Sequence, residues 1–141
     1  MFSKILVAVD GSDASYRALD AALFLSEKLG SNITAIYVME NIPTVYIQSQ
    51  KILDDLLEAR KNDSQKILEK CSSNAAQKGI TINTNLLEGN PASTILDFSK
   101  REKFEVIILG RRGKGHFKEL VLGSVSSKVL HHSSCPVLLM R

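Results

Sequence analysis

The segment ILVAVDGSD, residues 5–13, joins two signals that decide the fold of this chain. Its first half is a continuous apolar run rich in β-branched residues, which is typical of a strand buried on both faces in a parallel sheet. The run stops at Asp10, and Asp10, Ser12 and Asp13 are each able to cap the helical pattern that begins at Ala14. The segment therefore predicts a buried strand, a tight turn and then a helix.

The same strand-then-helix unit recurs along the rest of the sequence. Strand patterns occupy residues 5–9, 32–39, 80–87, 104–110 and 136–140, and helical patterns occupy residues 14–30, 50–78, 91–103 and 124–133. This alternation predicts an open, doubly wound α/β fold with a parallel five-stranded sheet and helices on both faces. We expect residues 1–141 to form a single domain, with a ligand bound beyond the carboxyl ends of the strands.

The longest helical pattern, from about residue 50 to residue 78, carries an apolar stripe along its whole length. Gly79 follows it as a predicted helix terminator. We expect the stripe to be core or interface material. Its members are Leu53, Leu56, Leu57, Ile67, Leu68, Cys71 and Ala75.

Composition excludes several classes of protein. The chain has 141 residues, 23% charged residues and a formal net charge of +3, which is too mild to indicate a nucleic-acid-binding protein. The sequence lacks a run of about 18 apolar residues and a signal-peptide pattern, so we expect a cytoplasmic protein without a membrane partner. Cys71 and Cys135 lie far apart in the sequence, and we expect both to be reduced.

A second signal follows the fourth strand pattern, in GRRGKGHFKELVLGSVSSKVL, residues 110–130. Four of the eight glycines of the chain gather here among cationic side chains. Glycine lets backbone N–H groups approach an anion closely, and Gly123 and Ser124 stand where a helix begins, with unpaired N–H donors. The Ser124 hydroxyl can donate to a ligand or cap the helix. These features predict a polyphosphate-binding loop, although neither the Walker nor the Rossmann glycine spacing is present.

The spacing that fits is G-x2-G-x9-G-[ST], formed by Gly110, Gly113, Gly123 and Ser124. With it, the chain resembles the universal stress protein family, specifically its ATP-binding branch. The resemblance covers the whole length and includes KILVAVDGSDASYRAL, YVME, EGNPASTIL, VIILGRRGKG, LGSVSSKVL and CPVLLMR. It implies a Rossmann-like sheet of the adenine nucleotide alpha hydrolase type, with strand order 3-2-1-4-5.

The resemblance also implies an adenine nucleotide site. Asp10 matches an acidic residue that meets the adenosine, and Val38 matches a residue whose backbone reads the adenine edge. The glycines of the motif, with Ser124 and Val125, match phosphate- and ribose-binding positions, whereas Arg112 stands where the family varies. The full set is Ala8, Val9, Asp10, Val38, Gly110, Arg112, Gly113, Gly123, Ser124 and Val125.

The leading hypothesis is an ATP-binding stress-response protein that acts as a nucleotide-dependent sensor or regulator. ATP is the expected ligand, with or without Mg²⁺, and Asp10 could help to hold the metal. Because neither a catalytic base nor a dedicated metal cluster is evident, we expect a weak ATPase at most.

The last strand pattern, residues 136–140, reads as a sheet edge, and the resemblance implies a homodimer formed through it. The alternative is a dimeric adaptor of the same fold that holds no nucleotide, whereas Glu88 argues against a phosphotransfer receiver domain.

Overall fold

The apolar run at the start of the chain forms a central strand that is buried from both sides. In the computed structural model, which describes residues 1–41, 43, 47–111 and 122–141, strand β1 spans Lys4–Ala8. Ile5 and Val7 pack into one layer of the core and Leu6 packs into the other, because successive side chains of a strand alternate. The predicted two-sided burial of this strand is confirmed.

Strands and helices alternate through the described residues. After β1 come α1 (Asp13–Leu29), β2 (Asn32–Met39), α2 (Gln50–Gln77), β3 (Asn83–Glu88), α3 (Pro91–Arg101), β4 (Val106–Gly110), α4 (Ser124–His132) and β5 (Val137–Met140).

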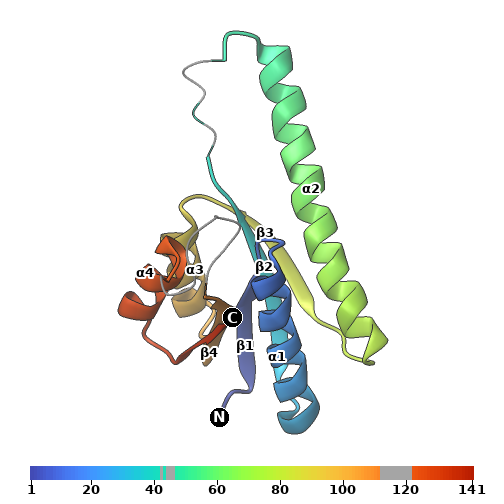
Figure 1. The fold of residues 1–141 in the computed structure, drawn as a ribbon, viewed down its shortest axis with the longest axis vertical. Helices are drawn as coiled ribbons and strands as arrows, with labels where there is room; N and C mark the ends of the chain where they lie inside the picture. The colour runs from blue at the N-terminus through green and yellow to red at the C-terminus, as the bar shows by residue number, and fades with distance from the viewer. Residues whose placement is uncertain (42, 44–46, 112–121) are drawn as a thin grey trace.

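The five strands form one parallel sheet in the order β3-β2-β1-β4-β5. Helices α1 and α2 cover one face, and α3 and α4 cover the other (Figure 1). From β1 the chain proceeds outward to β2 and β3, and then returns to β4 on the other side of β1. The strand order therefore reverses between β1 and β4, which is where open α/β sheets bind their ligands. This architecture confirms the predicted fold class and strand order.

The third strand begins later than predicted, at Asn83 rather than at residue 80. The Gly79 N–H donates to Ala76 O at 2.9 Å and the Ile80 N–H donates to Ala75 O at 3.0 Å. Gly79 has φ +72°, so these two bonds form a Schellman motif that closes the carboxyl end of α2. The N–H of Ile80 is consumed by the helix end, and β3 pairs with β2 only from Asn83 onward.

The apolar stripe of α2 is divided between the core and the surface. Ser64, Leu68, Cys71 and Ala75 are the buried residues of the helix, whereas Leu57 is 45% exposed. A 28-residue helix is about 42 Å long, but the 8-residue strand β2 is only about 27 Å long. The first half of α2 therefore extends past the carboxyl edge of the sheet (Figure 1).

Candidate nucleotide-binding site

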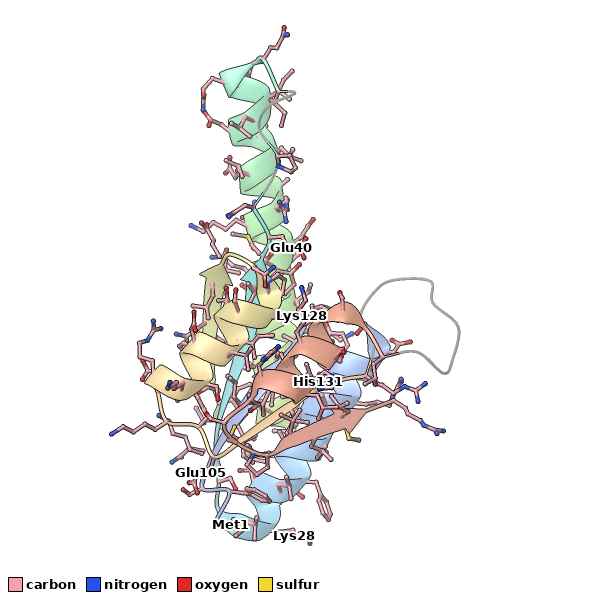
Figure 2. The ribbon with its side chains drawn as sticks, turned by 90° about the vertical axis from the view of Figure 1, so that its left-hand side faces the viewer. Met1, Lys28, Glu40, Glu105, Lys128 and His131 are labelled. Carbon is pink, nitrogen blue, oxygen red and sulfur yellow. The ribbon has the colours of Figure 1, made fainter. Side chains whose placement is uncertain are left out.

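Two connections open onto the carboxyl edge of the sheet at the point where the strand order reverses. Ala8 of β1 pairs with Leu109 of β4, so the β1–α1 turn and the β4–α4 connection leave the sheet side by side. Figure 2 labels residues at both ends of the sheet, with Glu40 just after the carboxyl end of β2 and with Met1, Lys28 and Glu105 toward the opposite end. The features described below lie at the end of the sheet marked by Glu40.

The β1–α1 turn is tied together by its own side chains. Asp10 Oδ1 accepts the Ser12 N–H at 2.9 Å, and Ser12 Oγ accepts the Ser15 N–H at 3.2 Å. Gly11 between them has φ +85°, a conformation that favours glycine. Of the three residues predicted as possible caps of this helix, Ser12 is the one that caps it. Asp10 instead braces the turn, and its carboxylate lies at the edge of the sheet.

The β4–α4 connection is closed at its base by hydrogen bonds. The Gly123 N–H donates to Arg111 O at 2.9 Å, and the Arg111 N–H donates to Met140 O at 2.6 Å. The hydroxyl of Ser126, which is buried in the first turn of α4, donates to Gly110 O at 2.7 Å. These bonds fix the start of α4 against the end of β4, whatever the path of the residues between them.

Gly110 has a packing role that sequence reasoning missed. A Cβ placed on it would lie 2.9 Å from Ala14 Cβ and 3.2 Å from the Ser15 N. The first turn of α1 therefore packs directly against the end of β4. Glycine is needed here for close helix–strand contact, in addition to any approach of a ligand.

Within the described residues, the amino end of α4 has no side-chain cap. Gly123 occupies the N-cap position, with φ −63° and ψ 158°, and no capping hydrogen bond from a described side chain is present. Ser124 is the first helical residue, so its hydroxyl does not take the capping role that the sequence allowed. N–H groups at the start of a helix, together with the positive end of the helix dipole, are groups to which anions can bind.

A cavity of about 450 Å³ joins these features, within the size range of small-molecule sites. Eight of the ten predicted site residues line it: Ala8, Val9, Asp10, Val38, Gly110, Gly123, Ser124 and Val125. The other two, Arg112 and Gly113, lie outside the described residues. Positions that are up to 117 residues apart in the sequence thus meet around one cavity, as expected for a binding site.

The cavity differs in character from end to end. Near β2 and α3 the wall has the apolar side chains of Ile36, Val38, Pro91 and Ile95, with Glu40 and Arg60 at its rim, whereas near β4 it includes the backbone and hydroxyl groups at the start of α4. Such a site suits a ligand with a flat, mainly apolar part at one end and an anionic part at the other.

Sequence reasoning also missed two charged residues of this wall, Glu40 after β2 and Arg60 of α2. A signal for Arg60 was present. It lies four residues before Ser64, the first buried residue of the α2 stripe, so it shares the face that packs on the sheet. Most of the charged residues of α2 are exposed, so the sequence alone gave no reason to distinguish Arg60 from them.

Tyr16 lies on α1, the helix that begins beside the cavity, and its pKa is shifted. The pKa of Tyr16 on α1 is raised, first by burial and then by the charges of Cys71 and Asp10. Within residues 1–41, 43, 47–111 and 122–141, no three His, Cys, Asp or Glu side chains gather as a metal site would require. Over the same residues, no helix is long and apolar enough to cross a membrane.

The sequence model of the Universal stress protein family matches residues 1–141, the full length of the chain. The chain belongs to the universal stress protein family. Universal stress protein YxiE of Bacillus subtilis is 39% identical to it over 149 residues, covering 100% of both chains. A universal stress protein of Methanocaldococcus jannaschii is 32% identical over 141 residues, covering 100% of this chain and 83% of the relative.

A solved universal stress protein supports the fold as well as the family. The protein UspA from Lactobacillus plantarum superposes with a TM-score of 0.86 at 27% identity, covering 99% of this chain and 98% of that one. The parallel sheet and the reversal of strand order described above are therefore features shared with a universal stress protein.

Proposed function

We propose that this protein binds ATP in the cavity between β1 and β4 and acts as a nucleotide-dependent sensor or regulator. The observation that carries the proposal is the polarity of the cavity. Its apolar end, beside Val38 and Ile95, suits a purine base, and its other end presents the uncapped start of α4 to phosphate groups. The resemblance to the ATP-binding branch of the family points to the same ligand.

In this proposal, each part of the wall has a separate task. Val38 and Pro91 border the base, Asp10 lies beside the ribose, and the N–H groups of the first turn of α4 hold phosphate oxygens. Mg²⁺ usually binds through one or two carboxylates and the phosphates of its nucleotide, and Asp10 supplies a carboxylate on the cavity wall. The residues present therefore fit ATP with or without the metal.

Two solved structures of this fold support adenine nucleotides as the ligand class. One is a universal stress protein in complex with cAMP, with a TM-score of 0.74, and another is an Arabidopsis thaliana family member with AMP bound, with a TM-score of 0.70. Both are under 25% identical to this chain, so their likeness concerns the fold. The choice of ATP rests on the start of α4 at one end of the cavity and on the resemblance.

Rapid hydrolysis is not part of the proposal. Phosphoryl transfer requires a residue that orients the attacking water, and Asp10 already accepts a hydrogen bond from the Ser12 N–H. Among the described residues of the cavity wall, Asp10 and Glu40 are the only carboxylates and histidine is absent. Occupancy by the nucleotide, rather than turnover, is then the signal.

An adaptor that holds no nucleotide is the alternative, and the edge of the sheet favours an interaction role. Among the strands of the described residues, β5 pairs with β4 alone, and Leu138 on it is 40% exposed. An exposed apolar edge strand can pair with a second chain, so we also propose a homodimer formed through β5. Dimerisation is compatible with either function, and only the presence of nucleotide separates them.

The decisive experiment identifies the bound ligand. Purified protein is denatured, and the released small molecules are analysed by mass spectrometry, with calorimetric titration of ligand-free protein by ATP as a second measurement. Near-stoichiometric adenine nucleotide, or a saturable heat of ATP binding, is the expected result. Protein that releases no nucleotide and shows no heat with millimolar ATP would favour the adaptor.

A further inference from the structure

Arg60 occupies a position that the family resemblance does not assign. The buried residues of α2 recur as Ser64, Leu68, Cys71 and Ala75, at spacings of four, three and four. Arg60 lies one turn before Ser64 on this stripe, and its own carbonyl accepts the Ser64 hydroxyl at 2.8 Å. Because α2 runs antiparallel to the strands, one turn earlier in the helix lies closer to the carboxyl edge of the sheet. The stripe thus brings Arg60 to the end of β2, where the cavity opens.

The side chain of Arg60 separates two hollows. It lines the cavity between β1 and β4, and with Glu40 it also lines a second hollow of about 510 Å³ between the end of β2 and α2. The second hollow is bordered by Met39, Leu57 and Lys61. Arg60 and Glu40 are the residues common to both walls, so they form the partition between the hollows.

The described residues offer the guanidinium of Arg60 neither a hydrogen-bond acceptor nor an ion-pair partner. Within the described part of the chain, no carboxylate approaches it closely enough for an ion pair, and its N–H groups donate to no described acceptor. It is nevertheless only half-exposed. A planar guanidinium carries five N–H donors, so it can hydrogen-bond to acceptors of a ligand and can stack on a flat aromatic ring.

We propose that Arg60 binds the nucleoside part of the ligand and closes that end of the cavity. The proposal rests on the function proposed above and adds a binding residue to the same site. The position of Arg60 selects the nucleoside over the phosphates. Arg60 lies at β2, beside Val38 and Glu40, whereas the start of α4 follows β4. Two strand spacings, about 10 Å, separate β2 from β4.

Ligands of different length test this assignment. The dissociation constants of adenosine, AMP and ATP are measured by calorimetry for the parent protein and for Arg60→Ala. We expect Arg60→Ala to weaken all three by a similar factor, about tenfold, because hydrogen bonds to a charged group contribute this much or more. The variant should fold as the parent does, because alanine is the best helix former and the position is half-exposed.

Lys61→Ala is the matched control. It removes the same charge one residue further along α2, but Lys61 lines the second hollow and not the nucleotide cavity. Its effect on the three ligands should be less than twofold. Arg60→Lys keeps the charge without the planar group, and it should recover only part of the adenosine affinity if the guanidinium itself is required.

The losses of affinity for the three ligands show which part of the ligand Arg60 contacts. A loss that grows from adenosine to ATP would assign Arg60 to the phosphates, and equal affinity of Arg60→Ala and the parent would leave Arg60 without a ligand role. Either result would overturn this inference while ATP binding itself stands. A parent protein that binds none of the three ligands would instead overturn the proposed function.

Discussion

The two connections that meet at the reversal of strand order treat the start of their helices in opposite ways. In the β1–α1 turn, Ser12 caps α1 by accepting the Ser15 N–H, and Asp10 braces the turn. In the β4–α4 connection, Gly123 occupies the same capping position and contributes no side chain. Both helices begin at the edge of the same cavity.

The two helices differ in whether a side chain of the described residues accepts from a first-turn N–H group. Unpaired N–H groups at a helix start cost free energy unless a side chain, water or ligand satisfies them. α1 satisfies one of them internally and gains stability from it, whereas α4 leaves its first turn available to an anion. The bond from the Ser126 hydroxyl to Gly110 O and the bond from the Gly123 N–H to Arg111 O hold α4 in place without using the N–H groups of its first turn. The proposed phosphate contacts therefore lie at α4, where the described residues provide no cap.

The largest expected effect comes from giving α4 the cap that α1 has. Gly123→Asp places a carboxylate at a backbone conformation that any residue can adopt, with φ −63°. The carboxylate would accept a first-turn N–H and repel phosphate. ATP affinity should fall about a hundredfold, or about 3 kcal/mol, while the stability of the ligand-free protein rises by about 0.5 kcal/mol. Calorimetric titration and urea unfolding measure the two effects.

Gly123→Ala is the control for that variant, because it adds a Cβ without an acceptor or a charge. It should retain most of the ATP affinity. Equal losses in the alanine and aspartate variants would mean that space, rather than the free N–H groups, matters at this position.

The next effect tests the contact that holds the two connections together. Gly110→Ala puts a Cβ 2.9 Å from that of Ala14, so β4 and α1 must separate. Overpacking of this kind lowers the free energy of unfolding by about 2 kcal/mol. Urea denaturation measures the loss.

Ala14→Gly removes one of the clashing atoms, and combining it with Gly110→Ala forms a double-mutant cycle. The double variant should be more stable than the sum of the single losses predicts. Simple additivity of the two changes would contradict a direct contact between these positions.

The smallest effect concerns the capped helix. Ser12→Ala removes the cap of α1 and should lower the free energy of unfolding by about 1 kcal/mol. ATP affinity should change less than threefold, because the cap serves the helix and not the ligand. Ser49→Ala removes the cap of α2, whose first half extends beyond the sheet, and should lower global stability less. A large loss of ATP binding in Ser12→Ala would contradict the inference that the cap of α1 serves stability alone.

The order of elements was predictable because each depends on residues close together in the sequence. Residues 5–9 read as a doubly buried strand, and Gly30 and Gly79 mark helix ends, with positive φ at both. Eight of the predicted site residues line one cavity, because the motifs that predict them lie at strand ends and in the glycine spacing, and their role in binding stays a prediction. The start of β3 was misplaced because the Schellman bonds of Gly79 and Ile80 extend the end of α2 into the strand pattern.

By itself, the sequence determined the alternation of strands and helices, the position of the glycine-rich connection and the residues that end each strand, since these follow from local periodicity and turn chemistry. Only the tertiary structure decided how far α2 lies over the sheet, that Gly110 packs against Ala14, and that Arg60 lines the cavity between β1 and β4. These outcomes depend on the relative lengths of a helix and a strand and on which helix lies over which strand. Residues so distant in the sequence carry no local signal of their contact.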